Sequence, residues 1–215
     1  MKVIILGGFL GSGKTSVLLQ LARYIAGDTS GNSTKVVILE NEIGEVSVDD
    51  SLLKRNGYQV TNLFSGCVCC TMSGELILNL RKIRDDFNPE LVIMEATGVA
   101  FPDNIRKTIN QSLPELEVAV TCITDAKRWL RLLRPMEMLL EGQLEAAEVI
   151  LINKIDMVDS PTLADVEASI RTFNNGAEFF KISAARPIDP LILGTILNPE
   201  QETSINEERT STPSS

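Results

Sequence analysis

The sequence predicts an α/β fold with a mostly parallel sheet of about seven strands, covered by helices on both faces. Short apolar runs of strand length alternate along the chain with helix-like patterns of apolar residues. The strand candidates are apolar at successive positions, which is typical of parallel strands buried on both sides. With 215 residues, of which 44% are hydrophobic, the chain suits one domain with a sizeable core.

A phosphate-binding motif follows the first predicted strand. Residues 8–15, GFLGSGKT, match the P-loop pattern G-x-x-x-x-G-K-[ST] between a strand at 2–6 and a helix at 14–25. Glycines let the backbone N–H groups approach phosphate oxygens, and the helix start adds its positive end. A P-loop NTPase is therefore predicted, against the alternative of a glycine-rich turn before an ordinary helix. The predicted phosphate-binding residues are Gly8, Gly11, Ser12, Gly13, Lys14, Thr15 and Ser16.

Two side chains of the motif have specific expected roles. Lys14 can reach the β- and γ-phosphates as a point charge, and the Thr15 hydroxyl can ligate Mg²⁺. Ser16 can hydrogen-bond the neighbouring phosphate. Lys14 is accordingly a candidate catalytic residue, because phosphoryl transfer to water depends on positioning and charge stabilisation.

The remaining elements follow in alternation. Further strands are predicted at residues 35–39, 59–63, 91–94, 118–123, 149–152 and 178–182. Further helices are predicted at residues 73–87, 102–110, 129–144, 160–174 and 190–197. These elements place one domain at residues 1–198, and the polar residues 199–215 are expected to form a disordered, acidic, Ser- and Thr-rich tail.

Local signals set several of these boundaries. Asn88-Pro89 ends the helix at 73–87, because proline cannot continue it. Pro135 predicts a kink, or two helices meeting, within residues 129–144. Ser160 is predicted as an N-cap, with Pro161 in the first turn of the helix that follows.

An acidic segment comes directly after the second predicted strand. Glu40, Glu42 and Glu45, with two aspartates further on, lie where open α/β sheets bind ligands. The alternative is a solvated acidic loop, as most charge runs are. Glu42 is the candidate for orienting the attacking water, although its neighbours Glu40 and Glu45 compete for that role.

Three of the four cysteines are clustered. Cys67, Cys69 and Cys70 lie within a short stretch, and thiolates suit Zn²⁺, with Co²⁺ or Ni²⁺ remaining open. Glu40 or Glu45 could complete the shell of ligands. A buried structural thiol cluster or a redox pair is the alternative. The fourth, Cys122, falls in an apolar strand and is expected to fill the core.

A base-recognition motif follows a later strand. In Asn153-Lys154-Ile155-Asp156, the aspartate can accept hydrogen bonds from the N1–H and N2–H groups of guanine, and the lysine stem can pack over the ring. The Asn153 amide can serve the other edge of the purine, and Ser183-Ala184 follow after another strand. The motif predicts GTP rather than ATP, against the alternative of a polar loop capped by Asn153. An ATP-dependent kinase with a structural zinc is the less favoured alternative.

Composition argues against several functions. The net charge of −9 and the lack of a basic block argue against nucleic-acid binding. No apolar run reaches the roughly 18 residues of a membrane helix, and residues 3–10 run into the P-loop rather than into a cleavage site for a signal peptide. A cytoplasmic protein is therefore expected, without a membrane partner.

Taken together, the motifs resemble those of the CobW-like GTPases, relatives of the HypB and UreG metallochaperones. The shared segments, in the order of the family, are GGFLGSGKT, ENEIGE, GCVCC, EATG and NKID, within roughly residues 2–197. The resemblance implies that Glu95, in the family's E-x-x-G motif, lies near Mg²⁺ and that the N–H of Gly98 faces the γ-phosphate. It also associates acids of the ENEIGE segment with metal binding.

The chain also departs from longer members of the family. It contains no histidine, so no His-rich segment can store metal, and it ends soon after the GTPase core, where longer members carry a second domain. A naturally minimal member and a fragment of a larger protein are both open.

The function predicted is Mg²⁺-dependent GTP hydrolysis coupled to delivery of a transition metal, zinc or cobalt, to a client metalloprotein. One alternative is a GTPase that gates a cobalamin-dependent enzyme or its cofactor loading, and another is a non-catalytic, nucleotide-responsive metal sensor. Intrinsic hydrolysis is expected to be slow, because no arginine is evidently placed as a finger. The resemblance also implies a GTP-dependent homodimer.

Overall fold

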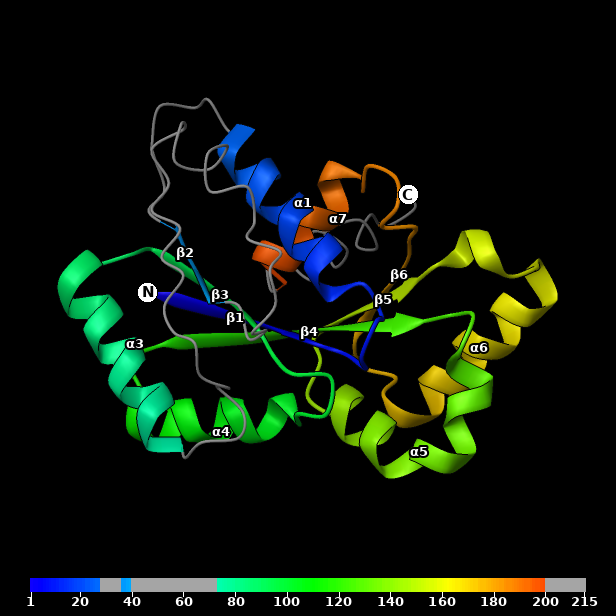
Figure 1. The fold of residues 1–215 in the computed structure, drawn as a ribbon, viewed down its shortest axis with the longest axis horizontal. Coiled ribbons are helices and arrows are strands. Elements are labelled where there is room, and N and C mark those ends of the chain that lie inside the picture. The colour runs from blue at the N-terminus through cyan, green and yellow to red at the C-terminus, as the bar shows by residue number, and fades with distance from the viewer. Residues whose placement is uncertain (28–35, 40–72, 200–215) are drawn as a thin grey trace, which may run out of the picture.

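The computed structural model describes residues 1–27, 36–39 and 73–199, and its centre is a parallel sheet (Figure 1). Within the described residues, six strands pair in the order β2-β3-β1-β4-β5-β6. Every pairing between these six strands is parallel, so their carboxyl ends meet at one edge of the sheet. The strands are β1 (Lys2–Gly7), β2 (Val36–Leu39), β3 (Leu91–Glu95), β4 (Glu117–Asp125), β5 (Val149–Asn153) and β6 (Glu178–Lys181).

Helices cover both faces of this sheet, as Figure 1 shows. On one face lie α1 (Lys14–Gly27) and α7 (Pro190–Leu197). On the other lie α3 (Ser73–Phe87), α4 (Pro102–Ser112), α5 (Trp129–Leu144) and α6 (Ser160–Phe173). The sheet thus separates two apolar cores, which explains why its inner strands are apolar at successive positions.

The two cores take alternate residues of the same strands. Along β1, Val3 and Ile5 belong to the larger core, whereas Ile4 and Leu6 belong to the core beneath α1 and α7. All four of these side chains are completely buried. Because successive side chains of a strand point to opposite faces, an uninterrupted apolar run can fill both cores.

Strand β1 holds the central position that the site requires. It pairs with β3 on one side and with β4 on the other. The chain therefore runs from β1 to β2 on one side of β1 and crosses later to β4 on the other. In open α/β sheets, ligands bind at such a switch point, outside the carboxyl ends of the strands.

The fold class predicted from the sequence is confirmed, and most element boundaries agree to within a few residues. The sheet described has six strands rather than about seven. The seventh candidate, at residues 59–63, lies outside the described residues, as does nearly all of the predicted tail. The kink predicted at Pro135 is present, because Met136 leaves the helical conformation with φ −130° and ψ 21°.

The predicted cap of α6 is wrong by one residue. Asp159 rather than Ser160 is the N-cap, and its carboxylate accepts a hydrogen bond of 2.9 Å from the N–H of Thr162. Asp159 has the extended backbone of a cap, with φ −82° and ψ 169°, whereas Ser160 is already helical. Asp159 and Ser160 are both of a type that caps helices, and the backbone conformation shows that Asp159 is the cap.

None of the helices in the described ranges combines the length and the apolar character needed to cross a bilayer.

Candidate functional site

The P-loop joins β1 to α1 and is shaped by its glycines. Gly8 and Gly13 have φ values of +134° and +108°, a region that side chains rarely allow. A Cβ atom on Gly8 would collide with the carbonyl oxygen of Ile123 in β4, and one on Gly13 with the side-chain amide of Asn153. The loop is therefore packed directly against β4 and against the end of β5.

Lys14 is held inside this loop. The residue is buried, and its Nζ donates a hydrogen bond of 3.0 Å to the carbonyl oxygen of Gly8. Folding the lysine back across the loop fixes its ammonium group beside the backbone that is predicted to meet phosphate. Thr15 and Ser16 follow at the start of α1, where helix N–H groups have no partner within the helix.

Glu95 approaches the P-loop from the end of β3. The Thr15 hydroxyl lies 3.1 Å from each carboxylate oxygen of Glu95, so it can donate to either. These two residues are 80 positions apart in the sequence. They lie together because β3 pairs with β1, which places Leu6 opposite Glu95 in the register.

The loop after β3 is held between the P-loop and α5. A Cβ atom on Gly98 would lie 2.5 Å from the backbone nitrogen of Leu10, so this position has no room for a side chain. The Gly98 carbonyl accepts a hydrogen bond of 2.8 Å from Nε2 of Gln143, which is buried on α5. The contacts hold Gly98 between the two loops. The role toward a γ-phosphate is expected of the Gly98 N–H, which belongs to the preceding peptide, and it stays a prediction.

Asn153, at the end of β5, joins two loops. Its Nδ2 donates to the carbonyl oxygen of Ser12 at 2.7 Å, and its Oδ1 accepts from the N–H of Ala184 at 2.8 Å. The buried amide therefore ties the P-loop to the segment after β6. Gln20 of α1 supports that segment, since its Nε2 donates to the carbonyl of Ala184 at 2.9 Å.

Lys154 and Asp156 form the other end of the site. Lys154 has a left-handed backbone, with φ 63°, and its Nζ donates to the carbonyl oxygen of Gly11 at 2.6 Å. Asp156 follows in the short 3₁₀ helix η1 (Ile155–Met157) and is exposed. A hydrogen bond from Ser183 is the main cause that holds the pKa of Asp156 below its ordinary value, so the carboxylate is ionised at neutral pH.

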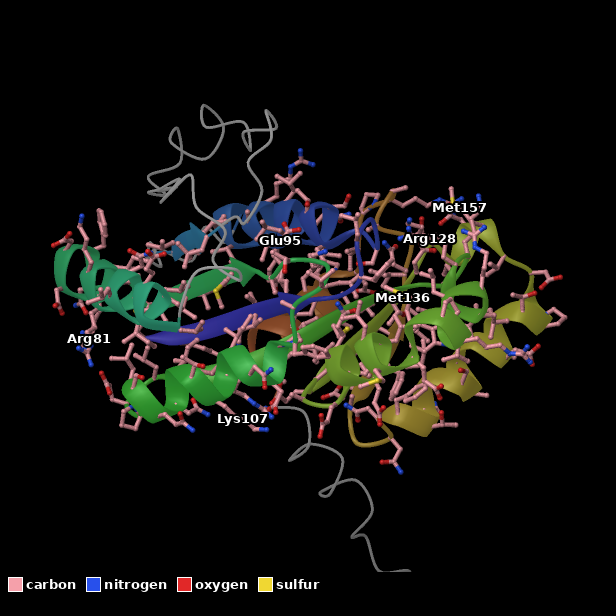
Figure 2. The ribbon with its side chains drawn as sticks, turned by 60° about the horizontal axis from the view of Figure 1, so that its bottom comes forward. Arg81, Glu95, Lys107, Arg128, Met136 and Met157 are labelled. Carbon is pink, nitrogen blue, oxygen red and sulfur yellow. The ribbon has the colours of Figure 1, made fainter. Side chains whose placement is uncertain are left out.

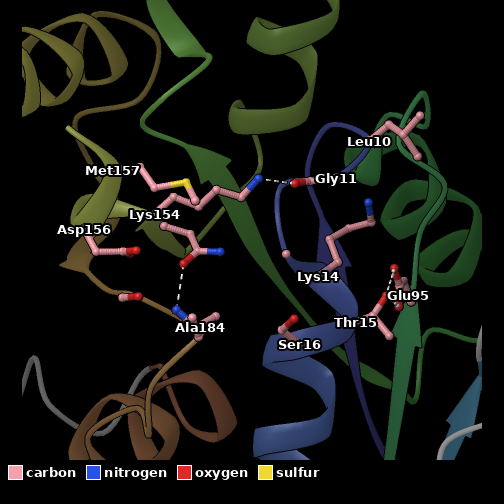
Figure 3. Close-up of a pocket in the computed structure, with 14 residues that line it drawn as sticks. Leu10, Gly11, Lys14, Thr15, Ser16, Glu95, Lys154, Asp156, Met157 and Ala184 are labelled. Carbon is pink, nitrogen blue, oxygen red and sulfur yellow. Dashed lines mark hydrogen bonds between the residues drawn. The ribbon is translucent and has the colours of Figure 1, made fainter.

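These segments line one open cavity of about 460 Å³ at the carboxyl edge of the sheet (Figure 3). Lys14, Thr15 and Glu95 lie at one end of it, and Lys154, Asp156 and Met157 lie at the other. The volume lies in the range of small-molecule sites. The lining residues are Leu10, Gly11, Gly13, Lys14, Thr15, Ser16, Glu95, Asn153, Lys154, Asp156, Met157, Ser183, Ala184 and Ala185.

The sequence analysis missed two sets of residues: Leu10, Met157 and Ala185, which line the cavity, and Gln20, Arg128 and Gln143, which contact the segments that line it. Figure 2 labels Arg128, at the start of α5, together with Glu95, at the end of β3, and Met157, at the end of η1. For Arg128 the available signal was its position three residues after Asp125, with which it forms an ion pair. For Gln143 the signal was a polar residue on the otherwise apolar face of α5, beside the buried Leu140 and Leu144.

The predicted transition-metal ligands lie outside the described residues. They are Glu40, Glu45, Cys67, Cys69 and Cys70, and the predicted water-orienting residue Glu42 lies there as well. Within the ranges that the structure covers, no group of three or more Cys, His, Asp or Glu residues could hold a metal ion. Cys122 is buried in β4, and burial raises the pKa of its thiol to about 12, in keeping with the core role expected of it.

Comparison with known proteins identifies relatives along most of the chain. Residues 2–181 match the family model described as the CobW/HypB/UreG nucleotide-binding domain. The chain is 26% identical over 222 residues to the zinc-regulated GTPase metalloprotein activator 1 of Dictyostelium discoideum, covering 84% of this chain and 45% of the relative. It is 40% identical over 113 residues to the zinc chaperone YjiA of Escherichia coli, covering 50% of this chain and 34% of the relative. The chain thus spans less than half the length of these two curated relatives.

Solved structures agree with this comparison. Zn(II)-bound YjiA GTPase from E. coli superimposes with a TM-score of 0.60 at 27% identity, covering 88% of this chain and 59% of that structure. HypB from Helicobacter pylori, solved in complex with nickel, gives a TM-score of 0.60 at 17% identity and covers 100% of this chain and 91% of that structure. The second likeness supports the fold alone.

Proposed function

Since the chain belongs to the CobW/HypB/UreG family of nucleotide-binding domains, we propose that it hydrolyses GTP and couples this reaction to delivery of zinc to a client metalloprotein. The match to the family model confirms the resemblance seen in the sequence. Membership of this family identifies the chain as a GTP-binding P-loop protein. The relatives named above are zinc chaperones and a zinc-regulated metalloprotein activator. Hydrolysis, the metal and the client are the proposed part.

The observation that carries the proposal is the composition of the cavity. One end offers an ammonium group, a hydroxyl and a carboxylate, and the other offers a lysine stem and the ionised carboxylate of Asp156. Triphosphate chemistry needs the first set, and guanine needs the second, because its N1–H and N2–H are adjacent donors. Lys14 would thus meet the phosphates, and Asp156 the guanine base, at opposite ends of one bound GTP.

The residues present fit a magnesium ion. Thr15 and Glu95 bring a hydroxyl and a carboxylate together in the cavity lining, and Mg²⁺ prefers such oxygen ligands. Thr15 would hold the ion directly, and Glu95 would hold it directly or through water. When bound, the ion would offset the negative charge that develops on the phosphate oxygens.

Hydrolysis would otherwise depend on the chain's own groups. Lys14 holds its charge beside the loop, and Gly98, whose carbonyl is held by Gln143, lies against Leu10 at the same end of the cavity. Such preorganised charges and dipoles stabilise the transition state of phosphoryl transfer without reorganisation. Glu42 stays the candidate for orienting the attacking water.

Zinc is proposed as the cargo of the protein, bound by the cysteine cluster. Cys67, Cys69 and Cys70 are soft ligands of the type zinc prefers, with Glu40 or Glu45 as further ligands. In the sequence, the cysteines lie between β2 and β3. These two strands are neighbours in the sheet, and β3 is next to β1. This placement supports coupling, because β3 ends in Glu95, which contacts the P-loop threonine.

A metal titration tests the proposal. The reduced protein is titrated with Zn²⁺ and with Co²⁺, whose thiolate absorption reports on cysteine, in the absence of nucleotide, with GDP and with a non-hydrolysable GTP analogue. Cys69→Ser is expected to weaken metal affinity by at least the roughly 10- to 100-fold typical of losing a supporting partner, with GDP affinity nearly intact. Cys122→Ala is the matched control, because its thiol is buried and holds its proton.

The outcomes separate the alternatives. Metal affinity that differs between the nucleotide states supports coupling, since the two sites must then affect each other equally. Equal metal affinity in Cys69→Ser would remove the cysteines from the proposal. Single-turnover GTP hydrolysis with and without metal distinguishes a GTPase from a non-catalytic metal sensor. Gating of a cobalamin-dependent enzyme gains weight only if GTP is hydrolysed and the cysteines bind no metal.

A further inference from the structure

Asp125 is a buried carboxylate next to the nucleotide cavity. It is the last residue of β4, in register with Asn153 of β5, and its side chain is only 3% exposed. A carboxylate this deeply buried is costly unless it is paired. Its partners therefore indicate what its charge does.

Two cations share this carboxylate. Nζ of Lys154 and Nε of Arg128 both lie 2.6 Å from its Oδ2 atom, and the backbone N–H of Arg128 donates to Oδ1 at 3.2 Å. Burial alone would raise the pKa of Asp125, but the hydrogen bonds from Lys154 and Arg128 more than offset it, so that the pKa is lowered. The carboxylate is thus ionised and holds two positive side chains side by side.

Each of these cations also binds the P-loop. Lys154 Nζ donates to the carbonyl oxygen of Gly11 at 2.6 Å, and the guanidinium of Arg128 donates to the carbonyl oxygen of Leu10. These contacts link residues that are 143 and 118 positions apart in the sequence. Arg128 also lies over the ring of Phe9, 5.7 Å from its centroid.

The carbonyl contacts orient the loop. The C=O and N–H groups of a trans peptide point in opposite directions, and no cis peptide occurs among the described residues. Holding the Leu10 carbonyl against Arg128 therefore turns the N–H of Gly11 away from Arg128. Gly11 lines the cavity, whereas Arg128 is not among its lining residues.

We infer that Asp125 is a positioning residue, which holds Arg128 and Lys154 against two successive P-loop carbonyls and so couples the base-recognition segment to the phosphate-binding loop. The inference rests on the nucleotide site of the proposed function, but not on hydrolysis or on metal binding. Without the charge of Asp125, the two cations would repel each other at this position. The loop would then lose both of its contacts together.

Asp125→Asn tests the inference, because it keeps the size of the side chain and removes its charge. GDP binding to the full chain is measured by calorimetry, and the off-rate with a fluorescent GDP. The affinity is expected to fall by about tenfold, through faster dissociation. Glu167→Gln is the matched control, because Glu167 also pairs with one arginine and one lysine, Arg171 and Lys181, away from the P-loop. Its GDP affinity is expected to be unchanged.

A double-mutant cycle distinguishes positioning from a general loss of structure. The double variant combines Asp125→Asn with Lys154→Met. If Asp125 acts through Lys154, the fold-loss of GDP affinity in this double variant is smaller than the product of the fold-losses in the two single variants. Losses that multiply, or unchanged GDP affinity in Asp125→Asn, would overturn the inference.

Arg128→Gln covers the case in which Asp125→Asn does not fold. This variant leaves Asp125 neutralised by Lys154, so it does not create an unpaired buried charge. Weaker GDP binding supports the inference, and unchanged binding contradicts it. The wild-type protein is measured first: if it binds no GDP, it is the nucleotide site of the proposed function that fails, which separates the two failures.

Discussion

At the scale of the residue, Asp156 is the side chain proposed to select the base of the nucleotide. The left-handed backbone of Lys154 lets the chain turn sharply after β5, and η1 then presents the Asp156 carboxylate at one end of the cavity. Ser183 donates a hydrogen bond to this carboxylate and favours its charged form. The charged form is the one that the proposed hydrogen bonds from guanine require.

Asp156→Asn is predicted to abolish the preference for GTP. An amide cannot accept from both the N1–H and the N2–H of guanine, so GTP affinity should fall by about 100-fold or more. Xanthosine triphosphate, which has a carbonyl in place of the 2-amino group, should gain relative affinity. Competition among GTP, XTP and ATP measures this preference, and an unchanged ranking would contradict the assignment of Asp156 to the base.

Cys122 is predicted to be chemically inert in the folded protein. Burial raises the pKa of its thiol to about 12, from an ordinary value of 9.0, so almost no thiolate is present at pH 8. Iodoacetamide at pH 8 should label the Cys122 peptide only after unfolding in urea, as judged by mass spectrometry. Equal labelling rates before and after unfolding would contradict the burial of this thiol.

The raised pKa of Cys122 also makes the stability of the fold depend on pH in the alkaline range. The folded state keeps the proton of Cys122 at pH values where the unfolded state loses it. The stability contributed by this thiol is therefore fully present below about pH 9, and it is lost as the pH rises toward 12.

At the scale of the element, α6 shows how a helix start depends on one side chain. Asp159 accepts a hydrogen bond from the N–H of Thr162. The pKa of Asp159 is lowered mainly by a hydrogen bond from the side chain of Thr162 and, after that, by the bond from this N–H. Pro161 lies in the first turn, where its missing N–H costs no helical hydrogen bond. The polar residue that follows the cap, Ser160, makes no capping contact of its own.

Asp159→Ala is therefore predicted to lower the urea concentration at the midpoint of unfolding, and Ser160→Ala to leave it nearly unchanged. The two alanine variants are matched because they are adjacent and both are exposed. Urea denaturation followed by circular dichroism measures the difference. A larger loss in Ser160→Ala than in Asp159→Ala would restore the cap expected from the sequence.

At the scale of the whole molecule, exposed apolar side chains lie beside the cavity. Leu10 of the P-loop is 59% exposed and Val99, after Gly98, is 61% exposed. The two loops are in contact, because Gly98 lies directly against the backbone of Leu10. Such a surface next to the nucleotide is consistent with the homodimer that the family resemblance implies.

We predict that a GTP analogue, but not GDP, doubles the mass of the particle in light scattering. Val99→Asp should prevent this change, because it places a charge in the apolar contact. Leu191→Asp is the control, since Leu191 is 73% exposed on α7, away from the cavity lining. No change in mass with the analogue would count against the dimer, and equal effects of the two variants would exclude the Val99 surface.

The sequence alone predicted the local elements and the residues proposed for the two ends of the nucleotide site. Successive apolar positions predicted the strands because a parallel sheet buries both faces of each strand. The P-loop glycines and the NKID segment could be recognised because their chemistry depends on residues close together in the chain. The predicted bounds of α3, which ends before Asn88-Pro89, and of α7 are the ones that the structure shows.

Only the tertiary structure decided which distant residues meet. The order of strands in the sheet places β3 and β4 on either side of β1. This order brings Glu95 to Thr15, and it brings Asp125 to Lys154, which contacts the P-loop. Local signals exist at Arg128 and Gln143, but they do not name Leu10 and Gly98 as the distant partners that the structure gives these residues. Hydrogen bonds between residues 80 to 143 positions apart depend on how the whole sheet is assembled, and for that physical reason they could not be derived from spacing in the sequence.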